Sequence, residues 1–447
     1  MDRTGQGSIL RQGGAVPTAG AAGTRLPADV VARAWQLEEL LGDPRDPANH
    51  RGYEALAGPG TPGPVALRER IAAEFLPRSK GGHFASAYLS APGLRPLLRR
   101  DPALGHAVAT AILFSSDGAD APVLPQAVDL ARLLAPVALS AAVGTALRCA
   151  VRAVVWGEEN GARWRLSLAG AFADLLACES LLTVALRTLS LPPDTGRLVR
   201  AAAGYVVPGL LAEVLDEVTL TLSECGHGVG DHEMQLCAKA VGDMAYVREA
   251  AGTATTCRTE LTSHVPAFAE ASAVSAAAGG GGGVASEALF GEAEEHDAAV
   301  SVDCAGALLG VLADTAARVG EGSTSEPAHD LARVARRLLT EYRLLGRPGR
   351  GAARTGLAAG PALVDRYAQI VLACAVLGVH RGAAAPGGSG FLARPAWALL
   401  ALSRTTQRLG VTSAGPVQDP RTDVAAELEA REWQNIDCDL HATRMPW

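Results

Sequence analysis

The stretch ECGHGVGDHEMQ, residues 224–235, gathers side chains that can carry protons or bind a metal ion. His227, Asp231 and His232 are its candidate substrate-binding residues. Imidazole exchanges protons near neutral pH, and imidazole, thiolate and carboxylate groups are ligands of zinc and iron. The spacing fits no known ligand pattern, however, and Asp231 is placed to cap the helix that follows. The stretch can be a polar loop between helices, a general acid–base site or a metal site; we favour the polar loop and assign no metal.

Two further places hold candidate acid–base groups. Arg248 and Glu249 directly precede a Gly-Thr pair in REAAGTATTC, and a carboxylate in a cleft without water has a raised pKa that suits proton transfer. The alternative is a solvent-facing Arg-Glu pair. His106 lies in the apolar stretch LGHAVAT, where it is a candidate catalytic residue or, alternatively, a hydrogen-bonded core histidine.

The segments that must position these groups show mainly the periodicity of helices. No segment alternates with period two for long enough to indicate a strand, so the sequence predicts an all-α fold. Asp101-Pro102 is expected to end one helix and begin the next. In chain order the expected helices are 30–41, 65–75, 92–114 with that break, 126–156, 165–189, 194–224, 231–250, 254–277, 331–345, 363–379 and 396–409.

Composition excludes several classes of protein. The formal net charge of −7, with arginines spread among acids, gives no electrostatic footprint for nucleic acid. The 8 cysteines lie far apart and without a CxxC pair, which indicates reduced core residues and a cytoplasmic location. The longest uncharged apolar runs, 133–147 and 368–379, fall short of the roughly 20 residues of a membrane helix. We therefore expect core helices, no membrane partner and, from the Gly-rich start, a disordered leader over 1–26.

Six segments of the chain carry a resemblance to a known family. They are LEELLGDPRDPAN (37–49), LRPLLRRDPALGHAVAT (94–110), LAGAFADLLACESLLTVALRTLS (168–190), AGTATT (251–256), VDRYAQIVLACAVLGVHRG (364–382) and GFLARPAWALLALSRTTQRLG (390–410). Together they resemble the acyl-CoA dehydrogenase family, in particular its long actinobacterial members. The preference for arginine over lysine also favours a high-GC bacterial source.

The resemblance implies a domain plan with one part missing. Family members have an N-terminal helical domain, a middle β domain and a C-terminal four-helix domain, with FAD and acyl-CoA bound where the three meet. Here only about ten residues separate Phe114 from Leu124, which leaves no room for the β domain. We therefore expect an acyl-CoA-dehydrogenase-like helical bundle with the β domain deleted. Its expected parts are 1–26 (leader), 27–122 (N-terminal helical domain), 123–277 (four-helix bundle), 278–297 (Gly-rich linker) and 298–447 (C-terminal helical extension).

The resemblance also implies that the flavin contacts are lost. Family members carry an Arg-x-Gln-Phe-Gly run whose Arg meets a flavin phosphate, and the matching stretch here is AVVWG, residues 153–157. A later Arg-Asp pair corresponds to Gly242-Asp243. Phosphate binding needs charge-assisted donors, so we expect no cofactor. Trp156, in the matching stretch, becomes a candidate substrate-binding residue.

Both positions of the family's catalytic base hold alanine. The base precedes Gly-Thr in most members, where this chain has Ala251, and it lies early in the first long C-terminal helix in others, where this chain has Ala131. The Gly-Thr stretch is thus similar to a degenerate active-site loop, with Thr253 a candidate catalytic residue. Asp129, in the run DLARL that matches the second base position, is another.

Two functions follow from this resemblance. The first is a flavin-independent enzyme of bacterial specialised metabolism that uses the acyl groove for cyclisation, isomerisation or elimination. Its substrate would be an apolar, polyketide-like molecule or an acyl thioester of CoA or a carrier protein, and the protein would be a homodimer. The second is a non-catalytic subunit that forms a heteromer with an intact FAD-dependent dehydrogenase. A true flavin dehydrogenase remains a further alternative.

Overall fold

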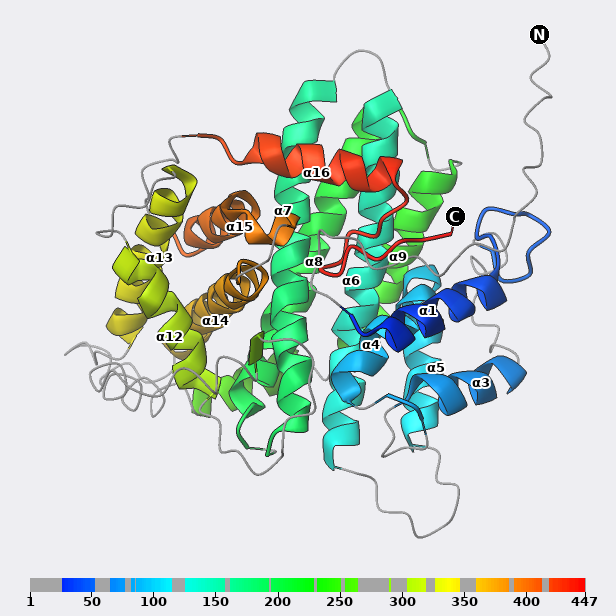
Figure 1. Ribbon diagram of the computed structural model, residues 1–447, viewed down its shortest axis with the longest axis horizontal. Helices are drawn as coiled ribbons and strands as arrows, with labels where there is room; N and C mark the ends of the chain where they lie inside the picture. Colours follow the sequence, from blue (N-terminus) through cyan, green and yellow to red (C-terminus); the bar gives the residue numbers. More distant parts are fainter. Residues whose placement is uncertain are drawn as a thin grey trace.

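The computed structural model confirms the all-α prediction (Figure 1). It describes residues 26–52, 65–76, 82–84, 86–114, 125–156, 161–192, 194–228, 231–250, 254–263, 289–290, 304–318, 326–345, 359–385, 390–411 and 418–446. Within these ranges no sheet strand occurs, and an isolated antiparallel bridge joins Ile436 to Arg444. The predicted domain bounds stay predictions, because most of the predicted leader and linker lies outside the described residues.

The helices of the N-terminal part are α1 (Ala28–Leu41), α3 (Val65–Phe75), α4 (Ala87–Arg100) and α5 (Pro102–Phe114). The predicted break holds: Asp101 ends α4, and its Oδ1 accepts a hydrogen bond from the backbone N–H of Leu104 at 2.8 Å in the first turn of α5. The predicted start of α4 at Pro92 is wrong. The helix begins five residues earlier because the Ser86 side chain caps it by accepting from Leu89 N–H.

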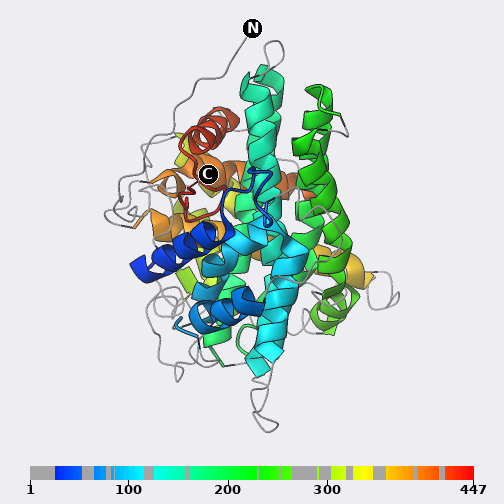
Figure 2. The same cartoon turned by 90° about the vertical axis from the view of Figure 1, so that its right-hand side faces the viewer.

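The long helices form the middle of the molecule. These are α6 (Pro125–Trp156), α7 (Gly161–Arg187), α8 (Arg197–Glu224) and α9 (His232–Ala250), and a further helix covers 254–263. The short η2 (Thr188–Ser190) follows α7. A helix that is apolar all round must be buried, and α7 packs against α6, α8, α14, α15 and α16. Figure 2 shows the blue N-terminal helices and the green helices on opposite sides of the teal ones.

The C-terminal part adds helices that lie against this bundle. They are α12 (Cys304–Ala317), α13 (Glu326–Leu345), α14 (Ala359–Ala383), η5 (Phe391–Ala393), α15 (Pro395–Arg408) and α16 (Arg421–Trp433). The described pair Leu289–Phe290 lies in the predicted linker and packs on α14: a Cβ at Gly378 would lie 2.0 Å from the Phe290 ring. This close approach requires glycine at 378.

Four helical spans are long and apolar enough to cross a membrane: Ala127–Val155, Arg163–Ser190, Arg197–Glu224 and Pro361–Ala383. They are longer than the uncharged runs considered in the sequence, because they continue past isolated charged residues. Between 72% and 100% of their apolar windows are buried inside the protein. These helices therefore bury the apolar surfaces of one another. The cytoplasmic location stays a proposal.

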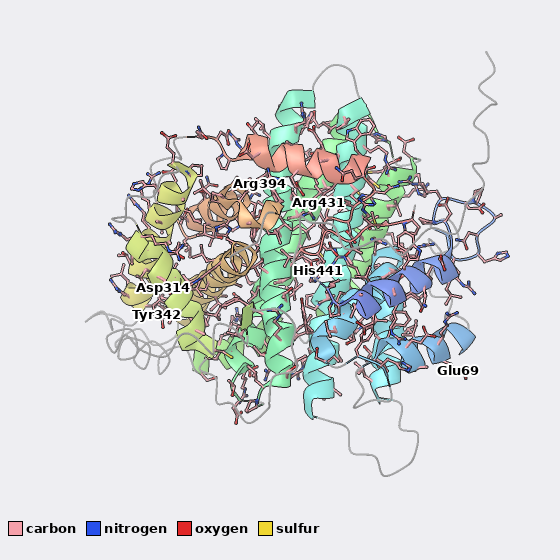
Figure 3. The ribbon with its side chains drawn as sticks, viewed as in Figure 1. Glu69, Asp314, Tyr342, Arg394, Arg431 and His441 are labelled. Carbon is pink, nitrogen blue, oxygen red and sulfur yellow. The ribbon has the colours of Figure 1, made fainter. Side chains whose placement is uncertain are left out.

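The chain after α16 folds back into the interior, and we call residues 434–446 the C-terminal tail. Asp437, Cys438, Asp439 and Leu440 in the tail are completely buried. Backbone hydrogen bonds join Asp437 N–H to Thr443 O at 2.8 Å and Met445 N–H to Asn435 O at 2.8 Å. Figure 3 shows Arg431 on α16 and His441 in the tail near the middle of the molecule. The tail thus brings charged side chains to the ends of α4 and α6.

Candidate anion-binding site

The structure does not describe the side chains of four candidate residues. Arg248 and Glu249 lie in the last turn of α9, but their side chains lie outside the described residues, as does Thr253. Trp156 ends α6, and its side chain also lies outside them. Their predicted roles remain predictions.

His106 and Asp129 join helices to one another. His106 Nε2 lies 3.1 Å from the carbonyl oxygen of Ala131 and 3.3 Å from Thr110 Oγ1, and burial lowers the pKa of the imidazole. Asp129 on α6 pairs with Arg200 Nε on α8 at 3.1 Å and with Arg132 at 3.7 Å. These contacts favour structural roles, which is the core alternative for His106.

The polar stretch 224–235 brings together three of its predicted groups. His227 Nδ1 lies 3.5 Å from Asp231 Oδ2 and 4.0 Å from Glu233 Oε2. Asp231 Oδ2 accepts from Gly228 N–H at 2.8 Å, so this carboxylate fixes the turn before α9. In the part of the chain that the structure describes, no group of three or more His, Cys, Asp or Glu side chains is arranged to hold a metal ion.

His232 lies at a different site. Together with Glu233 it lines a small pocket, which we call the arginine pocket, where α1, α4, α6, α9 and the C-terminal tail meet. The pocket has a volume of about 40 Å³, so it admits a small group, given that about 10–15 Å³ holds one water. Glu38, Cys149 and Met445 also line it, and its cations are Arg45, Arg99, Arg100, Arg148 and Arg152.

Three of these arginines also form contacts away from the pocket. Arg100 donates to the carbonyl oxygens of Gly42 at 2.8 Å and Arg51 at 2.9 Å, which ties the loop after α1 to α4. Arg148 Nε donates to Glu432 Oε2 at 2.8 Å, and Arg152 Nε donates to the other oxygen of that carboxylate at 2.7 Å. One glutamate on α16 thus serves two arginines on α6.

Arg99 and Arg148 converge on an uncharged acceptor. Both donate from Nη1 to Met445 Sδ, Arg148 at 3.4 Å, and both side chains are at most 10% exposed. A thioether is a weak acceptor and carries no charge that could offset two cations. Burial lowers the pKa of Arg99, and the neighbouring Arg148 lowers it further against the opposing effect of Asp437. An anion placed between these two guanidinium groups would relieve their repulsion.

Carboxylates offset most of the positive charge around the pocket, and Asp439 also attracts Arg99. Asp437 Oδ2 accepts from Arg99 Nη1 at 2.7 Å, and Arg99 also pairs with Glu38. The five arginines that line the pocket therefore face four carboxylates that line it or pair with its arginines: Glu38, Glu233, Glu432 and Asp437. Low dielectric strengthens the attraction of such a site for anions.

The stretch that resembles the flavin-phosphate contact offers no donor of that kind in its described side chains. Val154 is buried and Ala153 is half-buried, and the adjacent Arg152 is engaged with Glu432. Asp243, in the later matching pair, accepts from Lys239 at 2.8 Å. These described residues do not fit a flavin pyrophosphate.

Sequence reasoning missed the arginine pocket although it named His232. Its residues lie at 38, 45, 99–100, 148–152, 232–233 and 445, so no local spacing connects them. The available signals were the repeated arginines of LRPLLRR (94–100) and RCAVR (148–152), each with period 3 to 4 on one helix face.

No protein-family model and no curated protein sequence matches the chain. Among solved structures, the chain is similar to an acyl-CoA dehydrogenase of Bacillus anthracis, whose crystal structure contains FAD. The TM-score is 0.42 and the identity is 10%, over 69% of this chain and 57% of that chain. This chain thus matches a little over half of the length of that protein.

Proposed function

We propose that this protein binds an anionic substrate in the arginine pocket and is a flavin-independent enzyme that transfers protons on it. The observation that carries the proposal is the convergence of Arg99 and Arg148 on Met445 Sδ beside His232. Two buried cations with a neutral acceptor between them form an anion site that is organised before the ligand arrives. A site of this kind stabilises negative charge that develops during a reaction.

His232 supplies the acid–base group in this proposal. Its imidazole takes a proton from the carbon next to a carbonyl group, and the electron pair of that C–H bond moves to the carbonyl oxygen. The arginines stabilise the resulting enolate oxygen, and Glu233, which lines the same pocket, offsets the charge of the imidazolium. Where a carbon–carbon double bond adjoins the acidic carbon, the proton returns to the far carbon of that bond, which is an isomerisation. Otherwise the enolate expels a leaving group from the β-carbon or attacks an internal carbonyl, and the imidazolium gives its proton to the leaving group or to the new alkoxide.

The substrate class follows from the size and charge of the pocket. About 40 Å³ accommodates an oxyanion or carboxylate but not a whole substrate, so the apolar remainder must lie outside. An acyl thioester or a polyketide-like 3-oxo acid has the acidic carbon that this chemistry needs. From composition and resemblance we also propose that the protein is cytoplasmic and acts in bacterial specialised metabolism.

Proton exchange tests the enzymatic part of the proposal. We would incubate the protein in D₂O with short 3-oxo acyl thioesters and 3-oxo acids, and measure deuterium at the α-carbon by mass spectrometry. The wild type should exchange at least about 100-fold faster than buffer, and His232→Asn should lose most of this rate, because a positioned general base contributes roughly 10²–10⁴-fold. His329→Asn, at an exposed histidine on α13 away from the pocket, is the control. Equal exchange by wild type and H232N would reject the assigned role.

Exposed apolar residues favour the partner-subunit alternative. Leu220 on α8 is 55% exposed and Val241 on α9 is 47% exposed, and these two helices pack against each other. The subunit alternative requires side chains of this kind to form part of an interface. The mass in solution distinguishes the alternatives: a homodimer that exchanges α-protons supports the enzyme, and a monomer that binds only an intact dehydrogenase supports the subunit.

A further inference from the structure

An open cavity adjoins the arginine pocket. It has a volume of about 310 Å³ and is lined by Arg45, Arg152, Val155, Glu429, Glu432 and Trp433. We call it the tryptophan cavity. Arg45 and Arg152 line both spaces, so the two are neighbours and share cationic walls. A volume near 300 Å³ is at the lower end of small-molecule sites, and it suits one ring system with its substituents.

Trp433 ends α16 and is 68% exposed, the largest exposed fraction among the exposed large apolar side chains of the described residues. Tryptophan is among the most efficient side chains for binding a planar ring, because its face stacks on other aromatic rings. Here that ring stands at the rim of a cavity and not on a flat surface. Its position favours a ligand that covers it.

The charged residues of the arginine pocket and of the tryptophan cavity determine which end of such a ligand is charged. At the inner end, the proposed anion site of Arg99 and Arg148 receives the negatively charged group. At the outer end, Glu429 and Glu432 line the cavity, and each already pairs with arginine: Glu429 with Arg165 and Glu432 with Arg152. A second negative charge on the ligand would meet these carboxylates, so the outer part must be neutral.

Arg45 connects the two ends. It is exposed, lies in the loop after α1, and forms no ion pair within the described part of the chain. A guanidinium group without a carboxylate partner can donate to the ligand anion or stack on its ring.

We propose that the tryptophan cavity is an aryl subsite, and that the ligand of this protein joins a planar aromatic ring to one phosphate or carboxylate group, as an aryl-substituted 3-oxo acid does. The anion occupies the arginine pocket and the ring stacks on Trp433. The inference rests on the proposed anion site and names the substrate class of that site. Phosphate and carboxylate share the chemistry that the arginines recognise, and the ligands of the test distinguish them.

Calorimetric titration of the full chain tests this inference with four probes: inorganic phosphate, phenyl phosphate, cyclohexyl phosphate and benzoate. Cyclohexyl phosphate is the matched control, because it has the charge and nearly the size of phenyl phosphate without an aromatic face. We expect phenyl phosphate to bind about threefold to tenfold more tightly than cyclohexyl phosphate, the range of aromatic pair energies. The stronger of phenyl phosphate and benzoate identifies the anion.

Two variants separate the aryl subsite from the anion site. Trp433→Leu should abolish the preference for the phenyl ring and leave inorganic phosphate binding unchanged, and its exposed position should leave the fold intact. Arg148→Gln should weaken both phosphates. If W433L keeps the preference, or the wild type has none, the aryl subsite is rejected even where phosphate binds. If R148Q changes neither phosphate while W433L removes the preference, the anion site is rejected and the aryl subsite stands.

Discussion

Arg95 on α4 donates from Nε to Asp437 Oδ2 of the C-terminal tail at 2.8 Å, and the two residues are 342 positions apart in the chain. Arg95 also donates from Nη1 to Glu179 on α7 at 2.7 Å. Arg431 on α16 donates to the backbone oxygens of Asp437 at 3.0 Å and Asp439 at 2.6 Å. These contacts hold the tail in the interior, and the tail places Met445 against Arg99 and Arg148.

Asp437→Asn should lower the free energy of unfolding by about 3–5 kcal/mol. The substitution leaves Arg95 and Arg99 buried with one carboxylate fewer, and uncompensated buried charge has this cost. Asp419→Asn is the control, because Asp419 forms an exposed pair with Arg421 and should change stability by less than about 1 kcal/mol. Urea denaturation measures both. A D437N protein as stable as D419N would show that the tail is not held by this charge.

Asp437 should also determine how strongly the stability of the fold falls at acidic pH. Burial alone would raise the pKa of Asp437, but Arg95 and Arg99 outweigh it and hold the pKa well below the usual range. A depressed pKa gives stability that is fully present above the unfolded-state value, near pH 3.9, and is lost as pH falls toward the folded-state value. Denaturation between pH 2.5 and 6 should therefore show a steeper fall below about pH 4 in the wild type than in D437N. Parallel curves would contradict the assignment.

His106 should destabilise the fold in mild acid. Burial lowers the pKa of its imidazole in the folded state, whereas the unfolded chain takes up the proton near pH 6.5. The unfolded state therefore binds more protons below that pH, and stability declines as pH falls from about 6.5 toward the folded-state pKa. His106→Leu should flatten this decline, and His329→Leu should not. The prediction fails if wild type and H106L lose stability equally between pH 7 and 5.

Asp174 should couple the C-terminal helices to the bundle. This carboxylate on α7 is 1% exposed and accepts from two arginines of α15, Arg404 Nε at 2.6 Å and Arg408 Nη1 at 2.9 Å. Asp174→Asn removes the negative charge that both guanidinium groups share. It should therefore lower the free energy of unfolding by about 3–5 kcal/mol. It should also speed proteolysis after α14, which mass spectrometry of the fragments can follow. Glu213→Gln is the control, because that side chain is 59% exposed; equal proteolysis of both variants would contradict the coupling.

Much of the fold could be predicted because its helices carry their own signals. The interval Val65–Phe75 agrees in both bounds, and the break at Asp101-Pro102 follows from local capping chemistry. The helix Arg421–Trp433 lies in the predicted C-terminal helical extension but was not predicted as a separate element, because it is rich in charged residues and its apolar face, with Val424 and Leu428, is short. Its position is set by packing on α7 and α15, which no local pattern encodes.

The site could be predicted only in part, because its parts meet through tertiary contacts. His232 was recognised as a candidate from its residue type, but its neighbours Arg99, Arg148 and Met445 come from three other segments. The tail in particular gives a misleading signal: Asp437 and Asp439 suggest a solvated end of the chain, yet both are completely buried by pairing with arginine.

The central claim is that Arg99 and Arg148 form an anion site, and titration with inorganic phosphate tests it most directly. Arg148→Gln is the informative variant, because Glu432 keeps Arg152 as its partner. Arg381→Gln, which breaks an exposed pair with Asp314 on the far side of the molecule, is the matched control (Figure 3). Calorimetry should show phosphate binding by the wild type and by R381Q, and affinity about tenfold or more lower in R148Q, the value of a charge-assisted hydrogen bond. Absence of binding by the wild type, or equal affinity of all three proteins, would contradict the account.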